Sequence, residues 1–583
     1  MSGCDVNLFC RDVRRARLSM THLLQSIPMQ QTCANGWCKS SFDVTDDDLA
    51  FYDKVSPVFE GKKYTIPPPT LCPDCRMQRR MLWRNELHVF LGESALSGKK
   101  TMTQFTPNAP YVVYAYEEWQ SDAWDATDYG MTADPTQPFF SQFEAQLHRV
   151  PHPSRSVISN ENCDYANATS WSKNCYMVGA CSRNEDCSYC YNLSYCKDCM
   201  DCSFIYNCER CYGCIYCKQC TAVRYSKKCV DCSDSYFLLS CEHCSNCFGC
   251  ANISHKKYCF FNEQLTKEEY EKRISNIDLT SRDNVLEIQK EAQKHWLTFP
   301  QKYMRGDMNE NVTGNNISQS KNVRSCFDAS ELEDCAHCWT LHQSRDCQDC
   351  YGWGRTAELC YECTEVGDGS TNAVLSAKVY ASHDILYSFS CYRCHHLFGC
   401  VSMKDSSYCI FNTQYTKEEY DKKVPELIES MRTHGEWGEF FPMQIAPFAY
   451  NASAAIDYFP LTESEAERLH IPWYRDDNPP TSHLPAAPNT AVEIQKAPAI
   501  FRCNATQAPF KIIEQELAFY TREGIPPPDA CFAERNRRRF TESDSHKLWN
   551  RTCAKCEKLI STSYQPSRPE IIYCEQCYLE TVY

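Results

Sequence analysis

The chain has 583 residues, more than a single hydrophobic core usually holds, so several domains are expected. Its net charge of −15 argues against a protein that coats nucleic acid with its whole surface, although it permits a local basic site. The 43 cysteines would indicate a disulfide framework in a secreted protein. However, the start of the chain has no apolar run long enough for a signal peptide, and no stretch anywhere is long and apolar enough to span a membrane. We therefore expect a cytoplasmic protein in a reducing environment, where thiols bind metal or are buried.

The sequence predicts a mainly β protein with two tandem cysteine-rich β-solenoids of 12 residues per turn. Each solenoid is expected to end in a capping helix, and zinc-ribbon-like modules are expected at both ends of the chain. The expected segments, in chain order, are an N-terminal tail (1–32), a zinc-ribbon module (33–120), a connector (121–158), solenoid 1 with its helix (159–278), a helical connector (279–310), solenoid 2 with its helix (311–432), a proline-rich linker (433–500) and a C-terminal zinc-ribbon module (501–583).

The first module has four cysteines with the spacing of a metal site. Cys33 and Cys38 form one pair, and Cys72 and Cys75 form the other, within the phrase Cys72-Pro-Asp-Cys75-Arg76. Two such pairs can close a tetrahedron around one Zn²⁺, and four thiolates leave no open coordination position. We therefore predict a structural zinc site. A second set of positions in the same module reads Ser94, Ser97, Ala115 and Glu118 and has lost its cysteines.

A cluster of arginines follows these cysteines. It consists of Arg76, Arg79, Arg80, Trp83 and Arg84. Guanidinium groups beside a zinc module can bind phosphates, and Trp83 could stack on a base, so the cluster is a candidate RNA- or DNA-binding face. The alternative is a solvated helix whose arginines pair with nearby acids.

The middle of the chain shows a strict period. Between Cys163 and Cys259 there are 20 cysteines, and each is separated from the next by a multiple of three residues. In rows of twelve, the first, fourth, seventh and tenth positions are cysteine or another small or apolar residue in most cases, as in Cys199, Cys202, Ile205 and Cys208. The pattern predicts one coil per row, with two short strands, two sharp corners and these four columns facing the interior.

The state of these cysteines is open at this point. Facing sulfurs could form disulfides, sulfurs stacked about 4.8 Å apart could hold metal, or the side chains could be small buried thiols. Tyrosines beside the cysteines are expected on the outer faces, where they could form a contact surface. These are Tyr176, Tyr189, Tyr191, Tyr212 and Tyr216.

The solenoid occurs a second time. Residues 240–274 align without gaps with residues 390–424, with 17 identities in 35 positions. Thr266 with Glu269, and Thr416 with Glu419, fit the capping box of a helix start, and the first of these helices could run to about residue 295.

Rows of the second array are expected to start at Asn311, Val323, Cys335, Cys347, Cys360, Ala373, Ile385, Leu397 and Cys409, so two rows have thirteen residues. Val323 and Leu397 take the places of Cys175 and Cys247, which indicates a packed interior.

The C-terminal module repeats the first. Cys553, Cys556, Cys574 and Cys577 have the spacing of a zinc ribbon, so the chain is predicted to hold about two structural Zn²⁺ ions. The other site in this module is reduced to Cys503 and Cys531, with Glu534 in the place of a cysteine. A second arginine cluster follows, and it is also a candidate nucleic-acid contact. It consists of Arg535, Arg537, Arg538 and Arg539.

Together these phrases resemble a family of cysteine-rich zinc-ribbon proteins of candidate-phyla bacteria that has no established activity. The matching phrases are Leu49-Ala-Phe-Tyr52, Cys72-Pro-Asp-Cys75-Arg76, Trp119 with Asp122-Ala-Trp-Asp125, the cysteine-rich middle, Thr266-Lys-Glu-Glu-Tyr270 and Arg568-Pro-Glu-Ile-Ile-Tyr-Cys574. The resemblance implies zinc and this architecture, with Ser94, Ser97 and Glu534 as departures from the paired zinc sets. The coil spacing also resembles the 12-residue β-helix of insect antifreeze proteins, without their threonine ladder.

The sequence therefore predicts an intracellular zinc-binding scaffold that binds a protein partner, or RNA or DNA, and is not associated with a membrane. An alternative is storage of metal or thiols in the cysteine-rich array. An enzyme with a site between modules is a further alternative, but the chain contains neither a Gly-rich phosphate loop nor a Gly-x-Ser-x-Gly elbow.

Overall fold

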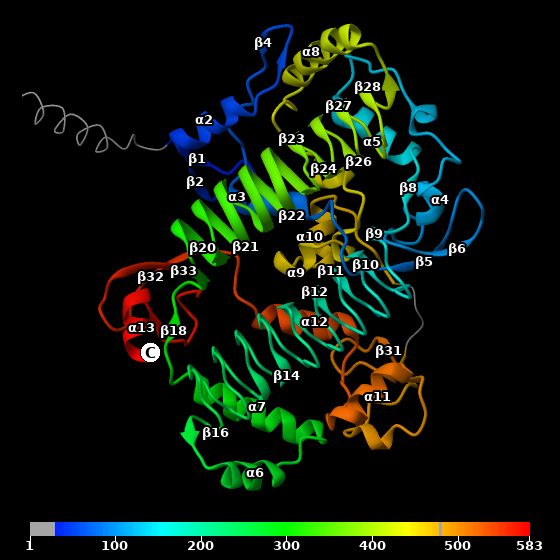
Figure 1. Cartoon of the computed structure of the whole chain (residues 1–583). Coiled ribbons are helices and arrows are strands. Elements are labelled where there is room, and N and C mark those ends of the chain that lie inside the picture. Colours follow the sequence, from blue (N-terminus) through cyan, green and yellow to red (C-terminus); the bar gives the residue numbers. More distant parts are fainter. Residues whose placement is uncertain (1–28, 477–480) are drawn as a thin grey trace, which may run out of the picture.

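The computed structural model describes residues 29–476 and 481–583, so most of the expected N-terminal tail lies outside the described residues. The protein is mainly β, and its central feature is a β-solenoid in two stacks of coils (Figure 1). The predicted fold class is thereby confirmed.

The first stack follows the predicted period of twelve. Leu193 lies opposite Ile205 in a parallel pair, and the following coils keep this step, as in Val223 opposite Ser235. The strands are β9 (Val157–Ile158), β10 (Asn167–Ser170), β11 (Gly179–Ser182), β12 (Tyr191–Ser194), β13 (Ser203–Tyr206), β14 (Thr221–Arg224) and β15 (Ser233–Tyr236).

Each coil has four corners, so the expectation of two corners is wrong. The backbone φ angle is positive at every third residue, for example 53° at Asn174, 49° at Met177, 53° at Ala180 and 55° at Arg183. A left-handed residue at every third position bends the chain four times in twelve residues. For residues other than glycine this conformation costs roughly 1–2 kcal/mol each, so the ladder and the packed interior must offset the cost.

The predicted columns face the interior. Cys199, Cys202, Ile205 and Cys208 are at most 2% exposed. The Cys202 Sγ atom lies 3.3 Å from the carbonyl oxygen of Met200 and 3.5 Å from that of Cys211, so this thiol donates to the backbone. All cysteines within the described residues are free thiols, which favours the interpretation of the solenoid cysteines as small buried side chains.

The second stack has three different coil lengths. Glu310 pairs with Lys321 at a step of eleven, Phe327 with Trp339 at twelve, and Glu358 with Thr371 at the predicted thirteen. The strands are β19 (Gly306–Asp307), β20 (Glu310–Ser318), β21 (Lys321–Ala336), β22 (Trp339–Gly367), β23 (Thr371–Val374), β24 (Ala377–Tyr380), β25 (His383–Leu386), β26 (Phe389–Tyr392), β27 (His395–Phe398) and β28 (Ser407–Ile410).

The expected first row of the second stack is shifted by one residue. Val312, and not Asn311, lies opposite Val323, and a register shift follows before Gly314. Asn311 is a corner residue with φ of 54°, which turns its side chain away from the interior.

Each stack ends in the predicted helix, and a hairpin that was not predicted precedes it. Hairpin β16 (Cys259–Phe260) and β17 (Glu263–Gln264) precedes α6 (Lys267–Ser275), and β28 with β29 (Thr413–Gln414) precedes α8 (Lys417–Thr433). Thr266 and Thr416 form the predicted capping boxes. The single helix expected up to residue 295 is instead two helices, because α6 ends at the Asn276 cap and α7 (Arg282–Trp296) begins separately.

The end modules consist of short hairpins followed by helices. In the N-terminal module these are β1 (Met29–Thr32), β2 (Ser41–Val44), α2 (Asp46–Lys54), β3 (Val58–Phe59), β4 (Lys62–Lys63), α3 (Pro73–Met81), β5 (Phe90–Glu93), β6 (Lys100–Thr103), β7 (Val113–Tyr114) and α4 (Tyr116–Gln120). In the C-terminal module they are β30 (Ala499–Arg502), β31 (Pro509–Ile512), α11 (Glu514–Glu523), α12 (Phe532–Glu542), β32 (Trp549–Thr552), β33 (Leu559–Thr562), β34 (Ile572–Tyr573) and α13 (Glu575–Val582).

The expected linker 433–500 is wrong for its first part, which belongs to the core. Phe440, Phe441 and Tyr450 are fully buried in the same cluster as the N-terminal module and the outer face of the second stack. The helices in this segment are too short to show a hydrophobic periodicity in the sequence, so the sequence did not indicate that it belongs to the core. They are η2 (Met443–Ile445), η3 (Tyr450–Ala452), α9 (Ala455–Tyr458) and α10 (Glu463–Arg468), and η4 (Ala491–Glu493) lies further along the chain.

The connector before the first solenoid also supplies core residues. Its elements are η1 (Ala126–Tyr129), α5 (Phe139–Arg149) and β8 (His152–Pro153), and the connector between the solenoids adds β18 (Gln301–Lys302). Phe143 and Leu147 of α5 are fully buried. β8 pairs with β7, and β18 pairs with β34, so each connector is joined to one end module.

The end modules dock crosswise. The N-terminal module packs on the second stack, where Tyr52 and Tyr361 have ring centroids 5.1 Å apart. The C-terminal module packs on the first stack, where Tyr520 and Tyr212 are 6.0 Å apart. In Figure 1, α3 accordingly lies beside β22, and α12 lies along the coils of β12 to β14.

Candidate metal centres

The N-terminal cysteine cluster is assembled from a hairpin turn and a helix start. Cys33 and Cys38 lie in the turn between β1 and β2, and Cys72 is the N-cap of α3. The Sγ atoms of Cys38 and Cys72 are 3.7 Å apart, and the Cys72 backbone N–H donates to the Cys33 sulfur at 3.3 Å. With Cys75, one turn into α3, the four sulfurs lie within 4.8 Å of one another.

The C-terminal cluster has the same construction. Cys553 and Cys556 lie in the turn between β32 and β33, and Cys574 is the N-cap of α13. The Cys556 and Cys574 sulfurs are 3.7 Å apart, and the Cys574 N–H donates to the Cys553 sulfur at 3.2 Å. The eight cysteines predicted from spacing are thus brought together as two sets of four.

One cysteine in each cluster has surroundings that favour the thiolate, which is the form that binds metal, whereas burial and the neighbouring sulfurs raise the pKa of Cys33, Cys75 and Cys577. Hydrogen bonding with Cys75 lowers the pKa of Cys72 to about 5, and the start of α3 adds its positive dipole end. Burial alone would raise the pKa of Cys553, but backbone N–H groups of Cys574 and Cys556 lower it to about 6.

The donor set fits a structural metal ion. Four thiolates are soft ligands that select Zn²⁺ in a tetrahedral site, and no position remains for a water molecule or a substrate. Asn35, which motif spacing did not identify, donates its side-chain N–H to the Cys75 sulfur at 3.3 Å. Such outer hydrogen bonds orient ligands, and the position of Asn35 two residues after Cys33 is the only sequence signal for this role.

The two sites without four cysteines are closed by other contacts. Ser94 donates a hydrogen bond to the Glu118 carboxylate, and the Ala115 N–H donates to the Ser94 oxygen at 3.1 Å. Hydrogen bonds from Ser94 and Ser97 keep the pKa of Glu118 below its usual value. A hydrogen bond between hairpin and helix therefore replaces the metal bridge at this position.

The corresponding position of the C-terminal module is similar. The Thr506 N–H donates to the Cys503 sulfur at 3.4 Å, and the Thr506 hydroxyl lies 3.6 Å from the Cys531 sulfur. Glu534 binds Arg537 at 2.7 Å and Arg538 at 3.0 Å. Among the described residues, only the two sets of four cysteines bring three or more ligating groups this close, so the solenoid thiols form no further cluster of that kind.

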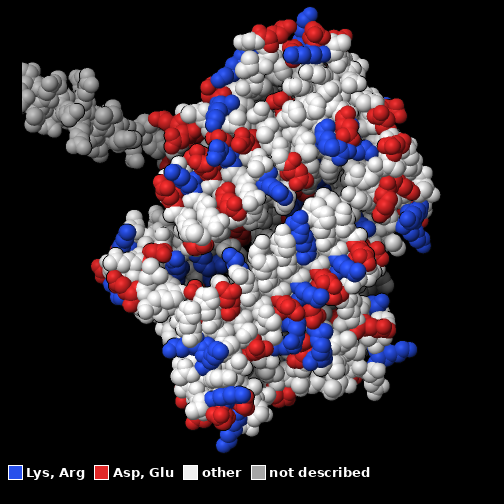
Figure 2. Space-filling view, in the orientation of Figure 1, with Lys and Arg blue, Asp and Glu red and all other residues white. Residues whose placement is uncertain are grey.

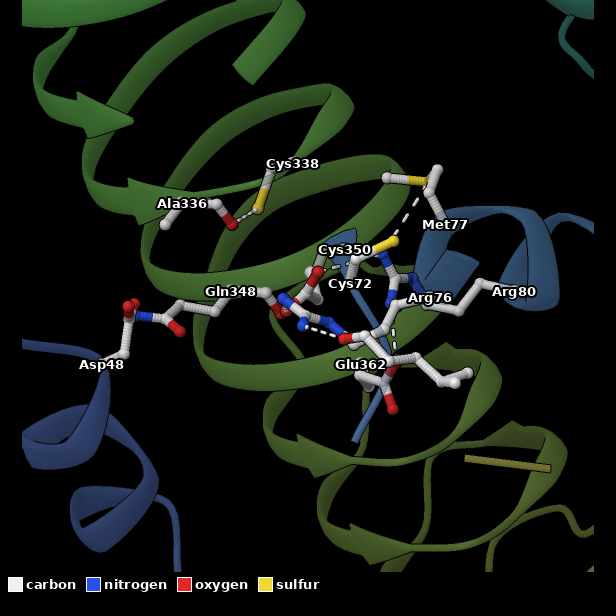
Figure 3. A network of polar contacts seen from close by, with 12 residues as sticks. Asp48, Cys72, Arg76, Met77, Arg80, Ala336, Cys338, Gln348, Cys350 and Glu362 are labelled. Carbon is white, nitrogen blue, oxygen red and sulfur yellow. Dashed lines mark hydrogen bonds and ion pairs between the residues drawn. The ribbon is translucent and has the colours of Figure 1, made fainter. Parts of the chain in front are cut away.

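The expected arginine interface needs correction. Arg76 and Arg80 bind Asp349 at 2.8 and 3.2 Å, and Arg80 also binds Glu362 at 2.9 Å. Figure 3 shows Arg76 and Arg80 reaching from α3 to the coil of the second stack beside Glu362. These side chains bind carboxylates on the solenoid corners and are not available to phosphates.

The C-terminal cluster repeats this contact on the other stack. Arg535 and Arg539 bind Asp201 at 2.6 and 2.8 Å. Asp201 and Asp349 occupy equivalent positions after Cys199 and Cys347, so the same docking contact is made twice.

The remaining members of the two clusters are also accounted for. Arg79 binds Glu362 at 2.8 Å, Arg84 binds Glu86 at 2.8 Å, and Trp83 is fully buried with its ring 4.4 Å from that of Phe441. Only Arg537 and Arg538 keep exposed side chains, and both bind Glu534. Seven of the nine candidate nucleic-acid contacts are therefore buried.

The tyrosine-rich face is a contact surface, but its partner is the chain's own C-terminal module. Tyr189 lies 5.7 Å from Phe532, and Tyr191 lies 5.0 Å from Phe540. Tyr212 and Tyr216 are buried as well, and Tyr176 is half-buried.

Comparison with known proteins adds little. No family model and no curated protein matches this chain, so the resemblance to candidate-phyla zinc-ribbon proteins stays a prediction. A solved structure assigned as an acetyltransferase from Desulfovibrio desulfuricans G20 matches at 7% identity with a TM-score of 0.09. The match covers 43% of this chain and 65% of the acetyltransferase chain. No helix in the part of the chain that the structure describes is long and apolar enough to cross a bilayer.

Proposed function

We propose that the protein is a zinc-stabilised cytoplasmic scaffold that binds a protein partner on the uncovered face of its first solenoid. The zinc part rests on two four-thiol clusters with sulfurs within 4.8 Å of one another. The free state of the described cysteines is consistent with a reducing compartment.

The metal assignment is tested by removing one ligand. Cys574→Ser is expected to lower the zinc content from two ions per chain to one and to unfold the C-terminal module, because structural zinc supplies roughly 10–16 kcal/mol of apparent folding free energy in small fingers. Elemental analysis measures the first effect and limited proteolysis the second. Cys531→Ser, at the equivalent helix start without a cluster, should retain both ions. A Cys574→Ser protein with its full zinc content would contradict the assignment.

The same stoichiometry separates a scaffold from a storage protein. The interior thiols donate to backbone carbonyls, as Cys190 does to Ser188 at 3.1 Å, and opening these hydrogen bonds would disrupt the coil. We therefore expect about two zinc ions per chain even in excess metal, whereas storage would give many more.

The proposed partner surface is a ladder of side chains along the first stack. Trp171, Tyr195 and Tyr206 remain 43–47% exposed, although most other large side chains of this stack are covered. The Arg183 guanidinium lies over the rings of Trp171 and Tyr195, at 4.8 and 5.3 Å. Trp, Tyr and Arg are the residue types that dominate protein interface hot spots, and stacking holds them rigid before binding.

Figure 2 shows Lys and Arg interspersed with Asp and Glu over the face that it draws. This distribution, together with the buried arginine clusters, favours a protein partner over RNA or DNA.

A photo-crosslinking amino acid at position 206 tests the partner surface in the native cell. We expect one defined protein adduct, and the double variant Trp171→Ala, Tyr195→Ala should reduce it at least tenfold. Leu559, which is 68% exposed on the C-terminal module, provides the control position and should not give the same adduct. If position 206 gives no adduct, or the double variant gives an unchanged one, the proposed surface is wrong.

A further inference from the structure

A cleft of about 570 Å³ lies between the two end modules. One wall contains Cys38 and Cys75 of the N-terminal cluster together with Gln78 of α3. The C-terminal module contributes lining residues between α12 and β32, and α9 contributes two more. The lining residues of the cleft include Trp37, Trp339, Asp457, Tyr458, Phe459 and His546. The size is within the range of small-ligand sites.

Aromatic rings form one continuous side of this cleft. Trp339 lies 4.6 Å from His546, 5.7 Å from Tyr458 and 5.9 Å from Phe459, measured between ring centroids. Tyr458 in turn lies 5.0 Å from His546. These contacts fix the rings in place, so the wall exists before a ligand arrives.

Asp457 is the charged residue of the cleft that lacks a contact partner, and the positive charge of Arg539 offsets only part of the effect of burial and of Glu86 on its pKa. Its carboxylate has neither a hydrogen bond nor an ion pair among the described residues. Burial raises the pKa of Asp457 to about 7, which means that this environment disfavours an isolated negative charge. A nearby cation would stabilise the carboxylate form.

The other charged groups that line the cleft already have partners. Asp544 binds Lys228 at 2.6 Å and Arg305 at 3.0 Å. Lys547 lies 3.4 Å from Asp74, and His546 lies 2.7 Å from Asp328. Arg568 is paired with Glu570.

We infer that this cleft binds an organic ammonium group, with Asp457 as its counter-ion and the rings of Trp339 and Tyr458 against its alkyl substituents. Aromatic faces attract a cation through their quadrupole, and the attraction is larger when the cation is desolvated. Four thiolates around one divalent ion would add negative charge where Cys38 and Cys75 line the cleft. This inference is independent of the partner surface proposed above.

A pair of probes of equal shape tests the charge requirement. Choline carries a trimethylammonium group, and 3,3-dimethylbutan-1-ol has the same shape without the charge. Trp37, Trp339 and Trp549 line the cleft, so binding to the zinc-loaded full chain can be followed by tryptophan fluorescence and checked by calorimetry. We expect choline to bind at least tenfold more tightly than the alcohol. Equal affinities, or no binding of choline, would overturn the inference.

The Asp457→Asn variant tests the counter-ion without changing the side-chain shape. It should weaken choline binding at least tenfold and leave binding of the alcohol unchanged. Asp43→Asn, an exposed carboxylate on β2 outside the cleft, should bind choline like the wild type. Equal choline affinity of Asp457→Asn and wild type would show that the ammonium group does not contact Asp457, and the inference would fail.

An ammonium group could come from a free amine or from a lysine side chain of a protein. Nα-acetyl-lysine amide, compared with the norleucine analogue, distinguishes these sources. Tighter binding of the lysine compound than of choline indicates a peptide ligand, and the reverse indicates a small amine. Both results support the ammonium site, provided that Asp457→Asn abolishes the preference for the charged compound over its uncharged analogue.

Discussion

His152 is a fully buried imidazole whose two ring nitrogens have different surroundings. Its Nε2 atom lies 2.7 Å from the carbonyl oxygen of Leu147, so this nitrogen carries the proton. Nδ1 is buried without a partner and is therefore the unprotonated nitrogen. Protonating it would place a charged, unbonded N–H in the core. Burial accordingly lowers the pKa of His152 to about 4.

This histidine should make folding sensitive to mild acid. An unfolded histidine has a pKa of about 6.5, so as the pH falls from 6.5 to 4 the unfolded chain binds a proton that the folded chain rejects. The folded state loses about 2 kcal/mol from this residue between pH 7 and 5. His152→Gln should show a pH dependence of the free energy of unfolding that is smaller by this amount, measured by urea denaturation at both pH values. His470→Gln, at an exposed histidine, should behave like the wild type, and an unchanged pH dependence in His152→Gln would contradict the assignment.

At the scale of the element, the solenoid coil separates adjacent residues into different environments. Cys247 is fully buried in the interior column, and its counterpart in the second stack, Leu397, is fully buried too. The preceding residue, Asn246, is a corner with φ of 52° and a partly exposed side chain. One step along the chain therefore separates a buried position from one at the surface.

Two substitutions in one coil test this arrangement. Cys247→Leu should fold, because the second stack already accommodates leucine in this column. Cys247→Asp should lower the melting temperature sharply or prevent folding, since an unpaired buried charge costs several kcal/mol, a large part of a domain's stability. Asn246→Asp introduces the same charge one residue earlier and should be nearly neutral. Equal melting temperatures for the two aspartate variants would show that the register is wrong.

At the scale of the whole molecule, the two end modules dock through the same kind of arginine–aspartate contact. The N-terminal module docks in this way on the second stack, and the C-terminal module on the first. The arginines of α3 bind Asp349 on the second stack, and those of α12 bind Asp201 on the first. Each end module thus binds, through its arginines, the solenoid stack that is more distant from it in sequence. This connection brings the two metal modules near each other and forms the cleft between them.

The two arginine–aspartate docking contacts should be independent, so that weakening one leaves the other intact. Asp201→Asn removes the counter-ion of Arg539 and leaves the buried Arg535 only Glu516, 3.4 Å away, and the loss of one partner costs about 3–5 kcal/mol in comparable buried pairs. Hydrogen–deuterium exchange should then rise roughly hundredfold or more in α12 and stay unchanged in α3. Asp349→Asn should show the reverse pattern. Equal effects of either variant on both helices would mean that the two contacts are not independent.

Several features could be predicted from the sequence because they depend on neighbours along the chain. A residue at every third position faces the interior of a twelve-residue coil, so the cysteine columns and the thirteen-residue rows were predicted correctly. The two metal clusters were predicted for a similar reason. Each pair of cysteines lies in a local turn or at a helix start, which holds the two sulfurs at a fixed spacing.

Other features were decided only by the tertiary structure. The sequence shows that Arg76 and Arg80 lie on one helix face, but Asp349 is more than 250 residues away, and only folding brings this carboxylate to them. The same holds for Phe440 and Phe441, which lie in a stretch without periodicity and become core residues by packing on the outer face of the second stack. The charge of a side chain is local, but its partner and its burial depend on the fold. Phosphate binding by an arginine and its pairing with a buried aspartate therefore cannot be distinguished before the contacts are known.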